Sequence, residues 1–448
     1  MNPLPVARGR VLLAALAALA LSACASPRAP DAAQADVLAI PLSPQQSATH
    51  VRLADFENQA TLTGEQAIVP SPAQPKVPGS HVEVRVSSKD GPGDALTMQW
   101  KDAWYASLRI ELAQPADLRP FLADGALEFD LDAIDMAGAG LTFATSCGPD
   151  CGRKFAWVVS SRALAGQGWQ HMVVPMRCFA HDGDPFDAVS QVFWLDSSGT
   201  GEAAIANLRL VRHATGGLAC PDYRTESVTP HPLEQVWSMD WWVPRHEEKL
   251  ARIRELAAAH QPVDLVFIGD SITHNWEKDG QAIWARHYAK YNALDLGFGG
   301  DHTENVLWRL QHGEIDGIRP KVAVVMIGTN NTGDRLEDPR TTAAGVRRIL
   351  DEIRQRQPDT RILLLAVFPR DEQPGSPLRR LNDRVNAIIS GYADGEHVFF
   401  LDITRQLTNA DGTLSRDVMP DLLHPNEKGY EIWATQMEPM LLRLLAQP

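Results

Sequence analysis

The sequence has 448 residues, enough for two or three domains of ordinary size, and 44% of them are hydrophobic and 22% charged. This composition excludes a collagen-like, low-complexity or wholly disordered chain. The formal net charge is −14, so nonspecific binding of nucleic acid, which needs a basic surface, is not expected. The five cysteines are an odd number, so at least one has a role outside any disulfide.

The first residues have the pattern of a secretory signal. Arg8 and Arg10 precede an apolar run over 11–21, which is too short to span a bilayer. The run ends in Leu21-Ser-Ala-Cys24, which resembles the lipobox of bacterial lipoproteins, where the cysteine is lipidated. The resemblance implies a signal peptide over 1–23, lipidation at Cys24 and export to the outer membrane, on its periplasmic or cell-surface face. The alternative is a plain signal peptide that ends near a cysteine.

The next two hundred residues predict a tether, a β-domain and a linker. Residues 24–48 are rich in Ala, Pro, Ser and Gln, which is typical of a flexible tether. Within 49–213, apolar and polar residues alternate in short runs, which favours an antiparallel β-sandwich. These runs cover 81–86, 108–112, 127–131, 155–159, 172–175, 192–195 and 205–211. Adjacent glycines and three prolines predict a linker over 214–235.

The pattern changes over residues 236–448, where strands read as continuous apolar runs. Four such runs alternate with helical stretches; the runs cover 263–268, 322–327, 362–367 and 397–401, and the helical stretches include 304–311, 341–355 and 378–389. Buried strands that alternate with helices predict a parallel sheet with helices on both faces.

Polar motifs follow the strand runs of this second domain. Gly269-Asp-Ser271 follows the run 263–268, and Gly328–Asn331 follows the run 322–327. Gly297–Asp301 follows a further short strand run over 295–297, and Asp421-Leu-Leu-His424 precedes the last helix. In an open α/β sheet, ligands bind at the carboxyl ends of the strands. A serine nucleophile needs a histidine base with an orienting carboxylate, together with donors aimed at the oxyanion. All of these groups are present at this edge.

The ordered motifs resemble the SGNH (GDSL-type) hydrolase family over residues 236–448. Within it, Leu296–Asp301, Val306–Leu310 and Gly328–Asn331 are most similar to the branch that contains the catalytic subunits of platelet-activating-factor acetylhydrolase and bacterial carbohydrate acetylesterases. The resemblance implies a three-layer α/β/α flavodoxin-like domain and ester hydrolysis without a metal or cofactor.

The same resemblance implies a role for each matched residue. Ser271 is the nucleophile, His424 the base and then the acid, and Asp421 orients the imidazole. The backbone N–H of Ser271, with Gly300 and Asn330, forms the oxyanion hole. No HExxH motif, paired CxxC or glycine-rich phosphate loop occurs, so we expect no cofactor and no metal.

Other residues near these motifs have a structural interpretation. Asp270 is expected to hold the turn before the helix, and His274 and His302 are expected at the rim or in support of the site. Trp276 lines the pocket or packs in the core. The loop over 368–370 could border the acyl or alcohol part of the substrate.

The N-terminal half resembles a galactose-binding-like β-sandwich appended to bacterial exo-β-glucanases. The resemblance rests on Thr145–Cys151, Trp169-Gln170 and Ala203–Leu210, and it implies a jelly-roll-like accessory domain that contacts glycan. Five tryptophans could stack on sugar rings, or could instead pack in the core: Trp100, Trp104, Trp157, Trp169 and Trp194.

Four cysteines remain once Cys24 is assigned to lipid. Cys147 and Cys151 are close enough in sequence for a local bridge, and Cys178 would then pair with Cys220, although four cysteines allow three connectivities. An exported compartment permits these bonds.

The sequence therefore predicts a lipid-anchored carboxylic-ester hydrolase that removes O-acetyl groups from carbohydrate. One alternative is a lipase or lysophospholipase-type esterase, which would need a broad apolar acyl channel. The other is a glycan-binding surface protein with a vestigial hydrolase domain, which the intact Ser271, Asp421 and His424 argue against.

Overall fold

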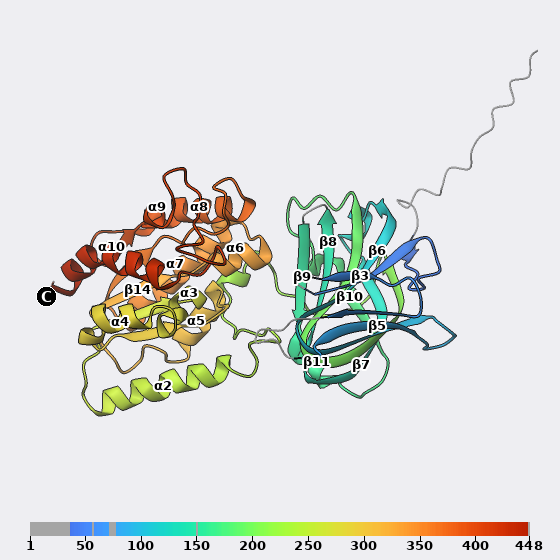
Figure 1. Cartoon of the computed structure of the whole chain (residues 1–448), viewed down its shortest axis with the longest axis horizontal. Helices are drawn as coiled ribbons and strands as arrows, with labels where there is room; N and C mark the ends of the chain where they lie inside the picture. Colours follow the sequence, from blue (N-terminus) through green and yellow to red (C-terminus); the bar gives the residue numbers. More distant parts are fainter. Residues whose placement is uncertain (1–35, 56–57, 71–77, 149–150, 447–448) are drawn as a thin grey trace, which may run out of the picture.

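The computed structural model describes residues 36–55, 58–70, 78–148 and 151–446. These residues form two domains that lie next to each other, a β-rich N-terminal domain and an α/β C-terminal domain (Figure 1). The two-domain fold class expected from the sequence is confirmed. The expected signal peptide and Cys24 lie outside the described residues. Within the described ranges, no helix combines the length and the apolar character needed to cross a bilayer.

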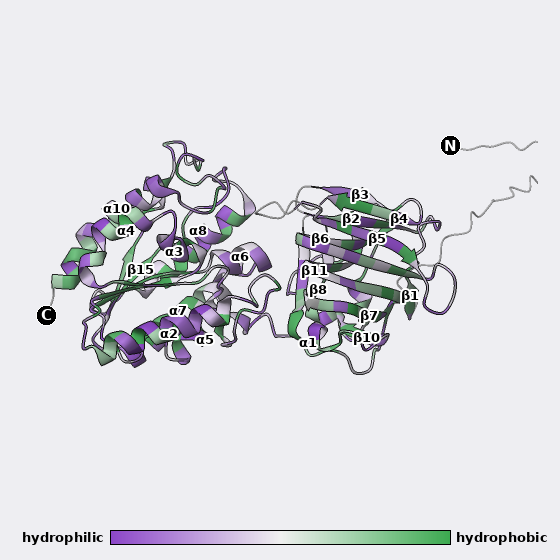
Figure 2. Ribbon diagram, turned by 60° about the horizontal axis from the view of Figure 1, so that its bottom comes forward, coloured by the Kyte–Doolittle hydropathy of each residue, from purple (hydrophilic) through white to green (hydrophobic). Residues whose placement is uncertain are grey.

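The N-terminal domain is an antiparallel sandwich built on two long strands. These are β6 (Ala95–Ala116) and β11 (Val189–Val211), which pair with each other. The other strands are β1 (Val37–Ala39), β2 (Thr49–Ala54), β3 (Gln59–Thr61), β4 (Gln66–Pro70), β5 (His81–Ser87), β7 (Ala126–Gly138), β8 (Leu141–Gly148), β9 (Cys151–Trp157) and β10 (Gln170–Pro175). Along them, green and purple segments alternate in Figure 2, as period-two burial requires.

Three details differ from the sequence expectation. Part of the segment 24–48, which was expected to be a tether, forms β1 and pairs with β11. The runs 192–195 and 205–211 are parts of one strand, β11, because its register against β6 shifts at Gly199, where φ is +75°, and the chain bends without leaving the sheet. The expected strand 155–159 ends at Trp157, and the helix α1 (Val158–Ala163) follows.

The five tryptophans proposed for stacking do not form one surface. Trp100 is fully buried, and Trp157 stacks on Phe143 with ring centroids 5.6 Å apart. Trp194 lies under the guanidinium of Arg109. Of the five, Trp104 is the one whose side chain is largely exposed.

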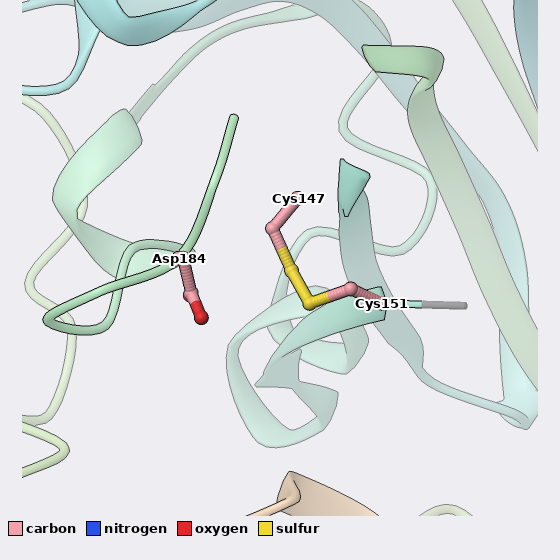
Figure 3. Close-up of side chains that lie close together, drawn as sticks. All are labelled: Cys147, Cys151 and Asp184. Carbon is pink, nitrogen blue, oxygen red and sulfur yellow. A yellow bond between two sulfur atoms is a disulfide. The ribbon is translucent and has the colours of Figure 1, made fainter. Parts of the chain in front are cut away.

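Both expected disulfides are present. Cys147–Cys151 joins β8 to β9 (Figure 3), and Cys178–Cys220 ties the segment after β11 back to the sandwich. The Cα atoms of each pair are 5.3 Å apart. The four cysteines other than Cys24 therefore pair as the sequence predicted.

The C-terminal domain is a five-stranded parallel sheet with the order β13-β12-β14-β15-β16. The strands are β12 (Leu265–Gly269), β13 (Leu294–Gly297), β14 (Val322–Met326), β15 (Arg361–Leu365) and β16 (Val398–Leu401). This is the flavodoxin-like order. The second strand, β13, lies on one side of β12, and all later strands are added on the other side. The carboxyl ends of β12 and its neighbours therefore form the crevice where ligands bind in such sheets.

Helices cover both faces of this sheet, and each face has its own apolar core. One face carries α2 (Trp242–Ala258), α5 (Thr303–Gln311), α7 (Pro339–Arg356) and α8 (Pro377–Ile389). The other carries α3 (Ser271–His274), α4 (Gln281–His287), α9 (Thr404–Leu407) and α10 (Glu427–Ala446). The helix α6 (Thr329–Arg335) follows β14 at the carboxyl edge. The three helices expected from the sequence match α5, α7 and α8.

The segment predicted to be a linker packs into the C-terminal domain. Ser227 is fully buried, and its carbonyl oxygen accepts a hydrogen bond of 2.9 Å from Thr303 Oγ1. The two domains also touch directly, because Arg153 of β9 donates to the carbonyl oxygen of Arg335 at the end of α6, at 3.0 Å. Asp184 holds the Arg153 guanidinium, with Nε 2.8 Å from Oδ2.

Candidate active site

Ser271 lies at the carboxyl end of β12, on the first turn of α3. The turn is fixed by Asp270, whose Oδ1 accepts a hydrogen bond of 3.0 Å from the N–H of Ile272. Burial raises the pKa of the Asp270 carboxyl to about 6, and the side chain caps α3, so its structural role is as expected.

The structure brings Ser271 together with His424 and Asp421, which are about 150 residues away in the sequence. Ser271 Oγ lies 2.8 Å from His424 Nε2, and His424 Nδ1 lies 2.6 Å from Asp421 Oδ2. The imidazole is therefore held at both nitrogens in one line of contacts. The side chain of Asp421 is 55% exposed and that of His424 is 28% exposed, so solvent reaches these two residues.

The loop before α10 holds the carboxylate of Asp421 in position through its own backbone. Leu422 adopts a φ of +63°, which turns the chain so that Asp421 Oδ1 accepts from the N–H groups of Leu423 and His424 at 3.0 and 2.7 Å. Partial burial opposes ionisation, but the hydrogen bonds from the His424 imidazole and from these amides outweigh it and hold the pKa of Asp421 well below its usual range. Asp421 is therefore a charged partner of the imidazole.

Gly299 and Gly300 form a tight turn after β13. Asp301 N–H donates to the Phe298 carbonyl at 3.2 Å, and Gly300 has a φ of +79°, the left-handed conformation that a type II turn requires at its third position. The N–H of Gly299 donates to His274 Nδ1 at 3.2 Å. Among the described residues the N–H of Gly300 has no hydrogen-bond acceptor. The turn thus leaves the N–H of Gly300, one of the two backbone donors that the sequence singled out, available to a ligand.

Asn330 lies at the start of α6, and its side-chain amide is already oriented. Its Nδ2 donates to the Asp301 carbonyl at 2.9 Å, which uses one of the two amide hydrogens and leaves the other for a ligand. The neighbouring Asn331 is fully buried and bonds instead to Thr303 and Ser227. Only the first of the two adjacent asparagines can therefore serve the site.

The two histidines near the edge support the loops. Burial, together with the positive charge of Arg245, lowers the pKa of His274 to about 4, so its neutral ring accepts from Gly299. Burial would also lower the pKa of His302, but the carboxylate of Asp334, 3.3 Å from Nε2, raises it. Both histidines hold neighbouring segments, as the sequence interpretation expected.

Two further regions named in the sequence interpretation are Trp276 and the loop over 368–370. Trp276 is 1% exposed and contacts Tyr430 and Trp433, so it belongs to the core and not to a pocket wall. In the loop over 368–370, Arg370 Nη1 donates to the carbonyl of Thr329 at 2.8 Å. This contact braces the residue that precedes Asn330.

The sequence analysis assigned no role to Arg309 of α5, which the structure places at the centre of the edge. Its guanidinium is fully buried, with Nε 2.8 Å from Asp301 Oδ2 and a second ion pair to Glu314. It also donates to the carbonyls of Leu296 and Gly269, the ends of β13 and β12, at 3.1 and 3.3 Å. A charged residue inside the apolar run 306–310 was the signal that could have indicated this role.

Two groups of potential metal ligands occur in the described part of the chain. Cys147, Cys151 and Asp184 lie together (Figure 3), but the two sulfurs are bonded to each other and offer no thiolate. Asp184 in turn holds Arg153. This donor set is therefore already used.

The second group is Glu226, His231 and Glu304. The guanidinium of Arg335 lies 2.9 Å from Glu226 Oε1 and 2.6 Å from Glu304 Oε1, so a protein cation is already paired with both carboxylates. The chemistry of this donor set gives no reason to assign a metal.

Comparisons with known proteins find relatives of each domain. The sequence profile of the GDSL-like lipase/acylhydrolase family matches residues 267–432, and a profile described as galactose-binding domain-like matches residues 58–210. The platelet-activating factor acetylhydrolase IB subunit alpha1 of Homo sapiens is 36% identical over 222 residues, which cover 49% of this chain and 90% of that relative. The alpha2 subunit of Rattus norvegicus is 33% identical over 219 residues, covering 49% and 91%.

Solved structures similar to each domain are more distant in sequence. An acetylxylan esterase from Geobacillus stearothermophilus matches with a TM-score of 0.33 and 19% identity, covering 41% of this chain and 94% of that one. The exo-1,3/1,4-beta-glucanase of a Pseudoalteromonas species matches with a TM-score of 0.33 and 17% identity, covering 41% and 22%. On the evidence of the family profile and the sequence relatives, this chain belongs to the GDSL-like lipase/acylhydrolase family and is an ester hydrolase that carries an N-terminal galactose-binding-like domain.

Proposed function

We propose that the chain is a serine esterase in which Ser271, His424 and Asp421 form the catalytic triad. The observation that carries this proposal is the continuous line of contacts from Ser271 Oγ to His424, at 2.8 Å, and from His424 to Asp421, at 2.6 Å. A hydroxyl in contact with an imidazole that a carboxylate orients is the arrangement that activates serine.

Each step of ester hydrolysis has a residue to perform it. The Oγ of Ser271 attacks the ester carbonyl carbon while its proton passes to His424 Nε2, and the ionised Asp421 stabilises the imidazolium. The tetrahedral intermediate collapses, and the alcohol leaves with the proton from His424. Water then attacks the acyl-enzyme with His424 again as base, which releases the acid and restores the Ser271 hydroxyl.

The oxyanion of the intermediate has three candidate donors in this proposal. These are the backbone N–H groups of Ser271 and Gly300 and the second amide hydrogen of Asn330. Donors held in place before the reaction stabilise the developing charge without reorganisation.

Replacement of Asn330 by alanine should lower kcat by about 10²–10³-fold with little change in KM, because this donor acts on the transition state. Steady-state kinetics on an aryl acetate measures both constants. Asn331→Ala is not a suitable control because Asn331 is buried, whereas the exposed Asn409→Ala should leave kcat unchanged. A kcat for Asn330→Ala within threefold of the wild type would remove Asn330 from the oxyanion hole.

The proposed substrate is an O-acetyl ester of a carbohydrate. Two findings support this: the matched relatives are acetylhydrolases by name, and the N-terminal domain matches a galactose-binding-like profile. The competing substrate class is a lipid ester, because the same relatives are named for platelet-activating factor.

Aryl esters of increasing acyl length separate these classes. For an acetylesterase, kcat/KM should be highest for acetate and fall steeply with longer acyl chains. Acetate release from a panel of acetylated polysaccharides, with Ser271→Ala as the inactive control, then identifies the glycan. Activity that rises with acyl length would contradict the carbohydrate assignment and favour the lipase class.

We also propose that the protein is exported and anchored to the outer membrane through a lipid on Cys24. The lipobox-like Leu21-Ser-Ala-Cys24 supports this, since acyl chains on one residue, at about 0.8 kcal/mol per buried CH₂, would hold the chain at the bilayer. Cys24→Ser should release the protein into the soluble periplasmic fraction, as measured by fractionation and immunoblotting. A Cys24→Ser variant that still sediments with membranes would disprove the anchor.

A further inference from the structure

Two tryptophans pack against the two glycines of the turn that follows β13. A Cβ added to Gly300 would lie 2.1 Å from Cη2 of Trp237, and one added to Gly299 would lie 3.5 Å from Cη2 of Trp241. The absence of a side chain at Gly300 therefore lets an indole ring rest directly on the backbone of the turn. The ring of Trp237 therefore lies against the same turn whose Gly300 N–H we propose as an oxyanion donor.

The two rings form one surface with a fixed geometry. Their centroids are 6.1 Å apart with 27° between the planes, and Trp241 Nε1 donates to the Trp237 carbonyl at 2.9 Å. The Trp241 ring also lies 5.9 Å from the ring of His274, which holds Gly299. Trp237 is nonetheless 50% exposed, whereas the adjacent Trp242 is fully buried. Trp237 is thus a large aromatic side chain that is held in position without being covered.

A hollow of about 440 Å³ adjoins this aromatic surface. It is lined by Asp240, Trp241, Pro244, Arg245, Glu248 and His274. In the described part of the chain, no side-chain hydrogen bond or ion pair joins the carboxylate of Asp240 or of Glu248 to another residue, and both residues are exposed. The hollow therefore combines an aromatic face with carboxylate oxygens that are free to accept hydrogen bonds.

This combination matches the chemistry of a sugar ring. A pyranose presents a face of C–H groups, which packs on an indole ring, and hydroxyls at its edge, which donate to carboxylates. A long acyl chain would instead need apolar walls, and three of the six lining side chains are charged. The acidic side chains also disfavour a negatively charged lipid headgroup.

We propose that Trp237 and Trp241, with Asp240 and Glu248, form a saccharide subsite beside the oxyanion turn, where the sugar ring that carries the ester, or its neighbour, stacks on Trp237. The inference rests on the proposed function, since it assigns the sugar-binding part of the same active site. It places sugar recognition in the catalytic domain, on α2 and the segment that precedes it, in addition to any in the N-terminal sandwich.

The test compares two substrates in the full chain. Partially acetylated xylo-, manno- and gluco-oligosaccharides report on the subsite, and p-nitrophenyl acetate, which has no sugar ring, reports on the reaction centre. For Trp237→Ala, we expect the ratio of kcat/KM for the preferred oligosaccharide to that for p-nitrophenyl acetate to fall about tenfold, with the loss mainly in KM. Trp237→Tyr, which keeps an aromatic face, should restore most of the ratio.

The matched control is Val243→Ala, which removes an exposed apolar side chain from the first turn of α2, two residues after Trp241. This variant should leave the ratio unchanged. Binding of deacetylated oligosaccharides to the Ser271→Ala variant, followed by tryptophan fluorescence, should weaken at least fivefold when Trp237→Ala is added.

Several outcomes would overturn the subsite. Equal losses of kcat/KM on both substrates for Trp237→Ala would leave the ratio unchanged and would mean that the ring only supports Gly300. A Trp237→Ala variant with no loss on either substrate would also overturn the subsite. So would a wild type that deacetylates none of the oligosaccharides. Failure of the proposed function looks different, because p-nitrophenyl acetate hydrolysis would then survive Ser271→Ala. If the loss of kcat/KM caused by Trp237→Ala instead grew with the acyl length of aryl esters, the indole surface would be assigned to an acyl chain.

Discussion

Replacement of Ser271 by alanine is expected to abolish ester hydrolysis, with kcat reduced on the order of 10⁶-fold. The physical reason is that the acyl-enzyme cannot form without the hydroxyl that lies 2.8 Å from His424 Nε2. Because the serine side chain is partly exposed and alanine removes only one oxygen atom, the fold and the unfolding midpoint should not change. Kinetics on an aryl acetate and circular dichroism measure the two properties.

The triad proposal also predicts how variants combine. His424→Ala should cost nearly as much as Ser271→Ala, and the double variant should be no slower than either, because residues that act as one unit are not additive. Asp421→Ala should cost less, since the imidazole would keep its contact with Ser271. Esterase activity that persists undiminished in Ser271→Ala would refute the assignment, as would fully additive losses in the Ser271/His424 pair.

Replacement of Arg309 by methionine is expected to lower the free energy of unfolding by about 3–5 kcal/mol. Methionine keeps much of the volume but removes the cation, which leaves the fully buried carboxylates of Asp301 and Glu314 without a counter-charge. It also removes the donors to the carbonyls of Gly269 and Leu296. Such a loss is a large part of the stability of an ordinary domain.

Urea denaturation of the full chain measures this loss. The matched control is Arg347→Met on α7, whose guanidinium is 50% exposed and pairs with Asp351 one turn away, so that the expected change is below about 1 kcal/mol. The activity of folded Arg309→Met should also fall, because Asp301 supports Asn330 through its carbonyl. Equal stabilities for the Arg309 and Arg347 variants would show that the buried network contributes little.

The sequence determined the architecture because that information is local. A period-two pattern specifies strands that are buried on one face, and continuous apolar runs specify strands buried on both, so the change near residue 236 separates the two fold classes. The motifs after each run then assign Ser271, Gly300 and Asn330 to one edge, since parallel strands end on the same side. The four-residue spacing favoured the Cys147–Cys151 bridge, and with it Cys178–Cys220, although the sequence by itself left all three connectivities possible.

The tertiary structure decided what depends on contacts between distant segments. The approach of Trp237 to Gly300, the buried pairs of Arg309 and the contact of Arg153 with α6 join residues that no local period relates. The joining of two predicted strands into β11 likewise depended on its partner strand β6, whose pairing carries the chain across the register shift at Gly199. Composition and periodicity report which face of an element is buried, whereas packing determines which other element covers it. For this protein the sequence alone therefore determined the chemistry available at the sheet edge, and only the packed structure determined which side chains hold that edge and which lie beside it.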